Sequence, residues 1–158
     1  MKRFIAIVAF LLPLAAWAGR EEGIEAYTIG DFPKAIAEFQ ALADQGDIDG
    51  QYFLGLFYHN GFGVKRDQTE SLKWFLKAAQ QGDARSQYYA GIMHAAGQGV
   101  AKDLPMADMW LSLSAANPKS SYRDSLYTKE EIDKIEKKMT PEQIAQAKEL
   151  TKNWKPQN

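Results

Sequence analysis

Residues 51–67 read QYFLGLFYHNGFGVKRD, and residues 87–103 read QYYAGIMHAAGQGVAKD. The second segment lies 36 residues after the first and keeps the same glutamine, tyrosine, glycine, valine and aspartate positions. The match continues beyond this stretch, since Trp74 is followed 36 residues later by Trp110. Several fixed spacings that agree at once indicate an internal repeat, and a period of this length is typical of helical solenoids.

The first half of each unit predicts an α-helix. In residues 48–60, Gln51, Leu54, Gly55 and Tyr58 fall on one face at the spacing i, i+3, i+4, i+7. A glycine inside a helix costs ~1 kcal/mol relative to alanine. We therefore expect a neighbouring helix to approach closely at Gly55.

The second half of the unit predicts a second helix, packed against the first. Gly61 and Gly63 end the first helix and permit left-handed backbone angles in the connection. Asp67 is placed to cap a helix over about residues 68–81, and Glu70 is placed to complete a capping box. The residues expected to face inward are Ser71, Leu72, Phe75, Ala78 and Ala79, and those expected to face water are Lys73 and Lys77.

These motifs resemble the Sel1-like repeat, a short helix-turn-helix unit related to tetratricopeptide repeats. The resemblance covers roughly residues 20–118. It implies an all-α fold, a right-handed solenoid of helical hairpins that serves as a protein-binding scaffold, and it implies no reaction. The expected single domain spans residues 19–158, with a partial repeat at 20–46, full repeats at 47–82 and 83–118, and a C-terminal cap at 119–158.

The cap is expected to consist of two further helices. Residues 120–127 suggest an irregular link, while Thr128 and the Thr140-Pro141 pair are suitable helix starts. The second repeat has Met109 and Leu113 where the first has outward-facing lysines. Because solenoid ends must cover their apolar surface, we expect the C-terminal helices to bury these two residues.

The N-terminus predicts export. Lys2 and Arg3 precede an apolar run at residues 4–16, and Ala16-Trp17-Ala18 follows as a small-x-small cleavage pattern. We therefore expect a signal peptide at residues 1–18, cleaved after Ala18, and a periplasmic or secreted bacterial protein. The run of 13 residues is shorter than the ~20 that cross a bilayer, so no stable membrane insertion is expected. The alternative is an uncleaved N-terminal anchor helix.

The composition excludes several classes of site. The chain has no cysteine, which removes disulfides, thiol nucleophiles and thiolate metal ligands. Its net charge of −1 comes without a concentrated basic patch, which argues against nucleic-acid binding. His59 and His94 are the two histidines, too few for a typical metal site, and His94 is expected to be structural because it aligns with Tyr58 on the packed face.

Catalytic motifs are scarce as well. The Gly61-x-Gly63 pair does not follow a strand, as a phosphate-binding loop would, and no Gly-x-Ser-x-Gly or His-Glu-x-x-His motif occurs. We expect no catalytic residue, cofactor or metal. A Ser, His and Asp triad assembled only by the fold stays open at this point.

A second apolar stripe on the first helix of each repeat is the candidate partner-binding surface. Its members are Phe53, Leu56, Phe57 and Asn60 in the first repeat, and Tyr89, Ile92 and Met93 in the second. Aromatic residues and methionine are enriched in the cores of protein interfaces. The alternative is that neighbouring helices bury this stripe, since a helix that is apolar all round is often buried. The binding site would then lie on the convex side or in the loops at Phe62 and Gln98.

Three functional hypotheses follow. The first is a protein–protein interaction module of the bacterial envelope that regulates or scaffolds a partner protein. Small exported Sel1-like proteins resemble immunity proteins, so its narrower form neutralises a toxic effector enzyme. The second is a hydrolase acting on cell-wall material or antibiotics, although the relatives linked to that activity are rich in cysteine. The third is a structural protein that associates with itself.

Overall fold

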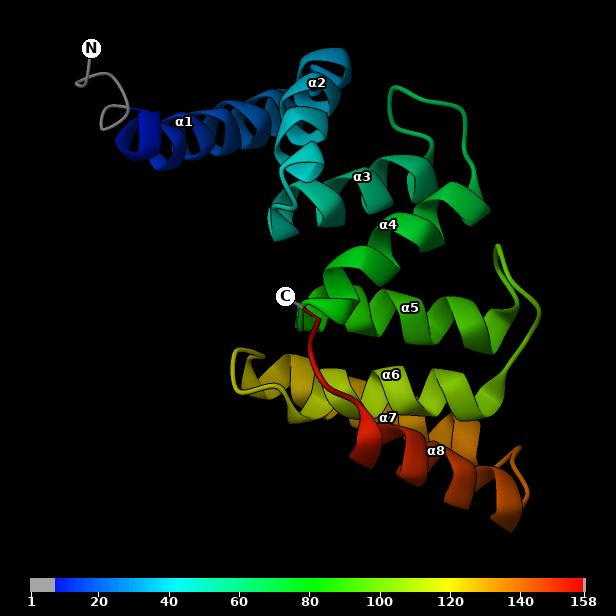
Figure 1. Ribbon diagram of the computed structural model, residues 1–158. Coiled ribbons are helices and arrows are strands. Elements are labelled where there is room, and N and C mark those ends of the chain that lie inside the picture. The colour runs from blue at the N-terminus through cyan, green and yellow to red at the C-terminus, as the bar shows by residue number, and fades with distance from the viewer. Residues whose placement is uncertain (1–7, 158) are drawn as a thin grey trace.

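The computed structural model describes residues 8–157, and this part of the chain folds into eight α-helices without a strand (Figure 1). The helices are α1 Val8–Ile29, α2 Phe32–Asp44, α3 Ile48–Asn60, α4 Gln68–Gln80, α5 Ala84–Ala96, α6 Leu104–Ala116, α7 Tyr122–Glu136 and α8 Pro141–Asn153. The all-α prediction is confirmed. Part of the predicted signal peptide, residues 1–7, lies outside the described residues.

The first six helices form three successive hairpins that stack into a solenoid (Figure 1). Helix α1 packs on α2, α3 on α4, and α5 on α6, while α3 also contacts α2 and α5 also contacts α4. Helices α3 and α5 therefore each lie between two even-numbered helices. This arrangement is the helical-repeat solenoid that the sequence predicts.

The helix limits follow from capping residues. The side chains of Asp47, Asp67, Asp83 and Asp103 accept hydrogen bonds from backbone N–H groups at the starts of α3, α4, α5 and α6. The predicted helix at 48–60 is confirmed. The predicted capping box is wrong in one part, because the Glu70 carboxylate pairs with Lys73 at 3.0 Å instead of reaching back to the cap.

Two helical glycines mark where the helices of a hairpin touch. A β-carbon at Gly55 would lie 2.6 Å from the ring of Phe75, and one at Gly91 would lie 2.6 Å from Cγ of Leu111. Real β-carbons do not come so close to other heavy atoms. The close approach predicted at Gly55 is confirmed, and it recurs one repeat later.

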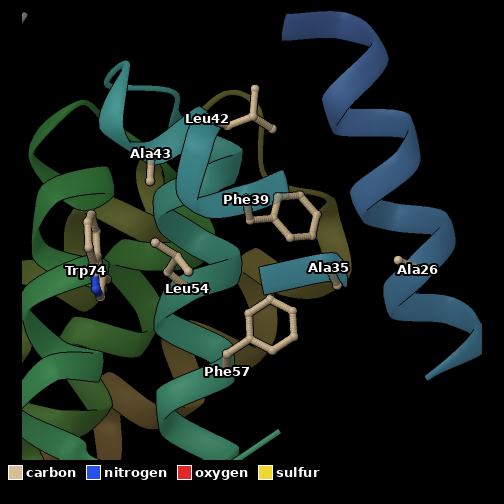
Figure 2. Packing of buried hydrophobic residues seen from close by; sticks show 8 residues of the cluster. All are labelled: Ala26, Ala35, Phe39, Leu42, Ala43, Leu54, Phe57 and Trp74. Carbon is tan, nitrogen blue, oxygen red and sulfur yellow. The ribbon is translucent and has the colours of Figure 1, made fainter. Parts of the chain in front are cut away.

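The first core cluster joins the partial repeat to the first full repeat (Figure 2). The ring of Phe39 points toward α1, where a β-carbon at Gly23 would lie 3.0 Å from it. Phe39 also stacks on Phe53 of α3, with ring centroids 4.1 Å apart. The buried members of this cluster are Ala26, Ala35, Phe39, Leu42, Ala43, Leu54, Phe57 and Trp74.

The first cap helix begins earlier than predicted. Helix α7 starts at Tyr122, so the expected irregular link at residues 120–127 is wrong. The side chain of Ser121 accepts a hydrogen bond from the backbone N–H of Asp124 and caps the helix. Thr128, the predicted start, is buried within the helix and donates its hydroxyl proton to the carbonyl of Asp124. Serine and threonine suit both roles, so residue type alone could not distinguish the cap from the interior position.

The second cap helix begins as predicted, with a capping box between Thr140 and Gln143. Helix α8 packs on α6 rather than pairing with α7. Leu150 and Trp154 pack on the cluster that contains the buried Met109, which confirms the predicted cover for Met109. Leu113 packs against the same cluster and stays half-buried. The tail then runs back toward α4, where the backbone N–H of Gln157 donates to the carbonyl of Gln80.

Candidate protein-binding groove

The structure buries the centre of the predicted binding stripe. Phe57 and Met93 are 0% exposed, and Leu56 is 8% exposed. The cause is the stacking of hairpins, because α3 lies between α2 and α4, and α5 lies between α4 and α6. For these three residues the interpretation as a free surface is wrong, and the buried alternative applies.

The other four members of the stripe do not form one surface either. Phe53 is half-buried on Phe39, and Ile92 packs into the cluster that α6 and α7 share. Asn60 is exposed, and its side-chain amide donates to the carbonyl of Leu56. Tyr89 alone borders an open hollow.

That hollow runs across the odd-numbered helices α3, α5 and α7 and has a volume of about 280 Å³. We call it the tyrosine groove. Its lining residues are Tyr52, Ala84, Arg85, Tyr88, Tyr89, Ser114, Lys119, Ser120, Asp124, Tyr127 and Thr128. Three consecutive odd-numbered helices thus contribute aromatic rings to one surface.

The tyrosine rings are held in place by their neighbours. The Tyr89 ring stacks on Phe75, with centroids 4.6 Å apart and planes 4° from parallel. The guanidinium of Arg85 lies 4.2 Å from the centroid of the Tyr52 ring, at the distance of a cation–π contact. Rings fixed in this way lose little conformational entropy when a partner binds.

Burial raises the pKa of three of the tyrosines that line the groove. It raises the pKa of Tyr52 to about 12, and the nearby Tyr89 contributes. Burial also raises the pKa of Tyr89 and, together with the adjacent Tyr127, that of Tyr88. At physiological pH these side chains are neutral, so each can donate and accept a hydrogen bond.

A second hollow of about 580 Å³ adjoins the tyrosine groove and shares Ala84, Arg85 and Lys119 with it. A series of ion pairs lines this hollow and links α1 to α5. Arg20 binds the side chains of Asp47 and Asp49. Arg85 binds Asp49 at 2.6 Å and Asp83 at 3.0 Å, and these carboxylates hold the guanidinium over the aromatic wall.

Sequence reasoning missed most of this groove, although part of it left a signal. Asp49 and Arg85 stand 36 residues apart with opposite charges, three residues before Tyr52 and Tyr88. Opposite charges at equivalent repeat positions suggest that neighbouring helices pair there. Tyr127 and the other residues from the cap have no counterpart in the repeat, so periodicity could not identify them.

Other kinds of site receive no support within residues 8–157. No group of three or more His, Asp or Glu side chains in this range could hold a metal ion. Within the same range, no helix is both long enough and apolar enough to cross a membrane. The tyrosine groove is the candidate site because side chains from α3, α5 and α7 meet there.

Comparison with known proteins identifies the repeat. The model of the Sel1 repeat matches residues 48–83 and 84–118. A stretch of 44 residues, 27% of this chain, is 48% identical to the ERAD-associated E3 ubiquitin-protein ligase component HRD3A of Arabidopsis thaliana, and it spans 6% of that protein.

Two solved structures have a similar fold. A protective antigen of uropathogenic Escherichia coli strains, which displays an SLR fold, superposes with a TM-score of 0.80 at 29% identity over 88% of this chain. A Sel1 repeat protein from Oxalobacter formigenes superposes with a TM-score of 0.57 at 30% identity over 59% of this chain. The matches span 29% and 38% of those two chains, so this chain corresponds to a part of each relative.

The Sel1 repeat is a protein–protein interaction module, and proteins built from it are typically scaffolds without enzymatic activity. The repeat matches, the hairpin stacking and the structural relatives agree with one another. Residues 48–118 are thus two Sel1 repeats, and the chain as a whole resembles Sel1-like repeat proteins in its fold.

Proposed function

We propose that this chain is an exported bacterial protein whose tyrosine groove binds a segment of another protein in the cell envelope. One observation carries the proposal: Tyr52, Tyr88, Tyr89 and Tyr127 line one hollow, with Arg85 among them. Tyrosine and arginine are enriched among the residues that dominate protein–protein binding energies. Tyrosine supplies apolar contact area and a hydrogen-bonding hydroxyl with few rotatable bonds.

The open shape of the groove favours a protein partner over a small metabolite. Small-molecule sites usually enclose most of their ligand. The tyrosine groove is open to solvent, which suits a side chain projecting from a larger partner. Its continuation into the second hollow supports contact along an extended segment.

Export rests on the signal-peptide pattern at residues 1–18. Arg20, Gly23 and Ala26 form described contacts of α1 with α2 and α3, and all three lie after the proposed cleavage point at Ala18. Cleavage there is compatible with these contacts. Mass spectrometry of fractionated cells should find the chain in the periplasm, beginning at Gly19. An intact N-terminus in the membrane fraction would rule out this form of export.

Photo-crosslinking in living cells tests the binding surface. A photoreactive amino acid at position 127 should give a discrete adduct with one protein, whereas the same group at the exposed Lys34 of α2 should not. The adduct should weaken strongly in a Tyr88→Ala variant that still melts normally. Equal adducts from both positions, or an adduct only from position 34, would contradict binding through the groove.

The crosslinked partner also decides which form of binding occurs. If it is a toxic enzyme, equimolar purified chain should suppress its activity in solution, and the chain is then an immunity protein. If the partner is an enzyme whose activity does not change, or is not an enzyme, the chain acts as a scaffold or regulator.

A further inference from the structure

Asp108 is a buried carboxylate outside the tyrosine groove. The residue lies on α6 and is 3% exposed. The hydroxyl of Ser112 donates a hydrogen bond to Oδ1 of Asp108 at 3.0 Å, but no basic side chain of residues 8–157 lies within ion-pair distance of the carboxylate. Aspartate is almost never fully buried unless it is paired. The chain thus leaves this charge without the partner that burial usually requires.

The carboxylate lies at the wall of a hollow where α7 and α8 both pack on α6 (Figure 1). Burial raises the pKa of Asp108, while the charges of Glu136 and Lys148 act on it in opposite directions. These two residues line the hollow, as does Ser112, which places the carboxyl group beside it. The hollow has a volume of about 260 Å³ and is lined by Asp108, Ser112, Glu136, Lys148, Thr151 and Lys152.

This hollow carries two charges of each sign. The carboxylates are Asp108 and Glu136, and the cations are Lys148 and Lys152 of α8. None of the four forms an ion pair with any residue that the structure describes. In the second hollow, by contrast, arginine and aspartate side chains neutralise one another. The charges beside α8 thus stay available to a ligand.

The four charged residues also differ in depth. Asp108 is buried and Glu136 is half-buried, whereas Lys148 and Lys152 are exposed. The hollow is therefore negative at its inner wall and positive on its solvent side. A lone cation would meet the two lysines, and a lone anion would meet the buried carboxylate. A complementary ligand carries both charges, with its cationic group inward.

We propose that this hollow binds a free α-amino acid, with the ligand's ammonium group on Asp108 and its carboxylate at Lys148. Hydrogen bonds between ionised groups are the stronger kind. A ligand role also accounts for a carboxylate whose burial opposes folding, because binding sites commonly trade stability for function. The hollow shares no lining residue with the tyrosine groove, so the site is independent of the protein-binding function.

The test compares three ligands with the same side chain and different charges. L-alanine carries both charges, L-alaninamide only the cation, and N-acetyl-L-alanine only the anion. Each is titrated at pH 7 into the ¹⁵N-labelled chain, and the backbone amide shifts are followed by NMR. L-alanine should give saturable shifts at residues 108–112 and 148–152, with a dissociation constant of ~1–10 mM, because the ligand is small and the hollow is open.

The two analogues should bind more weakly for different reasons. L-alaninamide loses an exposed ion pair, so its affinity should fall roughly two- to fivefold. N-acetyl-L-alanine loses the charged hydrogen bond to a buried carboxylate, so its affinity should fall about tenfold or more. Equal affinity of either analogue and L-alanine, or the absence of saturable shifts with L-alanine, would overturn the proposal.

Two variants assign the ligand's groups. Asp108→Asn keeps the shape and removes the charge, so L-alanine should bind about tenfold more weakly, whereas the matched control Asp133→Asn at an exposed position of α7 should bind it normally. Lys148→Gln should weaken L-alanine two- to fivefold, roughly the worth of an exposed ion pair, and leave L-alaninamide unchanged. Unaltered binding of L-alanine by either variant contradicts the proposal.

Thermal melts without ligand exclude an internal explanation. If Lys148 were the partner of Asp108 within the chain, Lys148→Gln would lower the melting midpoint clearly, and the proposal would be overturned. We expect an unchanged midpoint, because the two side chains form no ion pair. If Asp108→Asn fails to fold, the three ligands on the unchanged chain and the Lys148→Gln titrations still decide the question.

Discussion

The first full repeat (47–82) and the second (83–118) have helices of equal length and equivalent aspartate N-caps, but their outer faces differ. In the first repeat the ammonium of Lys77 lies 3.9 Å from the centroid of the Trp74 ring, and the helix faces water. In the second repeat, position 113 is a leucine, and the equivalent indole of Trp110 meets Trp154, with ring centroids 6.4 Å apart.

The same hairpin thus occurs in two environments: its second helix faces water in the first repeat and is covered by the C-terminal segment in the second. A conserved backbone register places a tryptophan at the same point in both units, and only the residues around it decide what covers it. Long lysine side chains can cover an aromatic surface while their charges stay in water. Methionine and leucine at the same positions require another segment of chain, which α8 and the tail supply.

Removal of residues 140–158 should have the largest effect on stability, because it uncovers the outer face of the second repeat. Met109 and Trp110 would lose their cover, and each buried side chain of this size is worth ~1.5–3 kcal/mol. We expect the free energy of unfolding to fall by at least about 3 kcal/mol, measured by urea denaturation with circular dichroism.

The control gives the second repeat the outer face of the first. Met109→Lys with Leu113→Lys should improve the solubility and reversibility of the truncated chain, yet destabilise the full-length chain by burying two ammonium groups under α8. A truncated chain with the stability of the intact one would show that α8 is dispensable.

Replacing the helical glycine by alanine should destabilise both repeats to a similar extent. Gly55→Ala would press a β-carbon into the ring of Phe75, and Gly91→Ala would press one against Leu111 at 2.6 Å in each case. Overpacking of this kind costs ~1–3 kcal/mol. Thermal melts should show a lower midpoint for both variants. Gly30→Ala is not a suitable control, because Gly30 has a positive φ angle that an alanine adopts only with strain. Ala37→Ser, on an exposed position of α2, is the suitable neutral control. Unchanged melting of both glycine variants would contradict the close packing.

The repeat was predictable from the sequence because its spacing encodes its structure. Periodic positions such as Gly55 and Trp74 recur 36 residues later, and each falls at the same point of the same helix in both units. The burial of the candidate binding stripe was not predictable in the same way. Burial of Phe57 from two sides depends on the stacking of α2 and α4 around α3, which the pattern of one helix does not contain.

The cap was only partly predictable for a related reason. The Thr140 capping box has a specific two-residue signature and was located correctly. Ser121 and Thr128 are both plausible starts of α7, and tertiary packing decides between them. Lys119 and Tyr127 reach the groove only because α7 follows α6 in the stack.

The two repeats also differ at an equivalent buried position, which holds a carboxylate in the second repeat only. Asp108, 3% exposed on α6, stands where the first repeat has Leu72. Asp108→Leu should raise the free energy of unfolding at neutral pH by about 1–2 kcal/mol, because an apolar side chain replaces a desolvated charge. Urea denaturation of the two proteins measures the difference.

The same variant has a predicted pH dependence. Burial raises the pKa of Asp108, and the hydrogen bond from Ser112 offsets this in part. The folded state therefore binds the proton more tightly than the unfolded state, so the destabilisation is full above the folded pKa and disappears below the unfolded pKa. The advantage of leucine should shrink between pH 7 and pH 4, and an advantage independent of pH would show that the carboxylate's ionisation is not its cause.

The smallest expected effect concerns one hydrogen bond that the first repeat has and the second lacks. The side-chain amide of Gln81 donates to the carbonyl of Gly46 and to Oε1 of Gln51. One repeat later, Asn117 donates to the carbonyl of Gly82, and Oε1 of the buried Gln87 has no partner in the described residues. Asparagine is one methylene shorter than glutamine, which accounts for the missing second bond.

Asn117→Gln should restore that bond and raise the free energy of unfolding by about 0.5–1.5 kcal/mol, the net worth of a typical hydrogen bond. The converse change, Gln81→Asn, should lower it by a similar amount because it leaves Gln51 unpaired. The decisive measurement is a double-mutant cycle with Gln87→Leu, in which the acceptor is absent. If Asn117→Gln stabilises the chain equally in that background, the gain comes from elsewhere, and the two repeats do not differ in this bond.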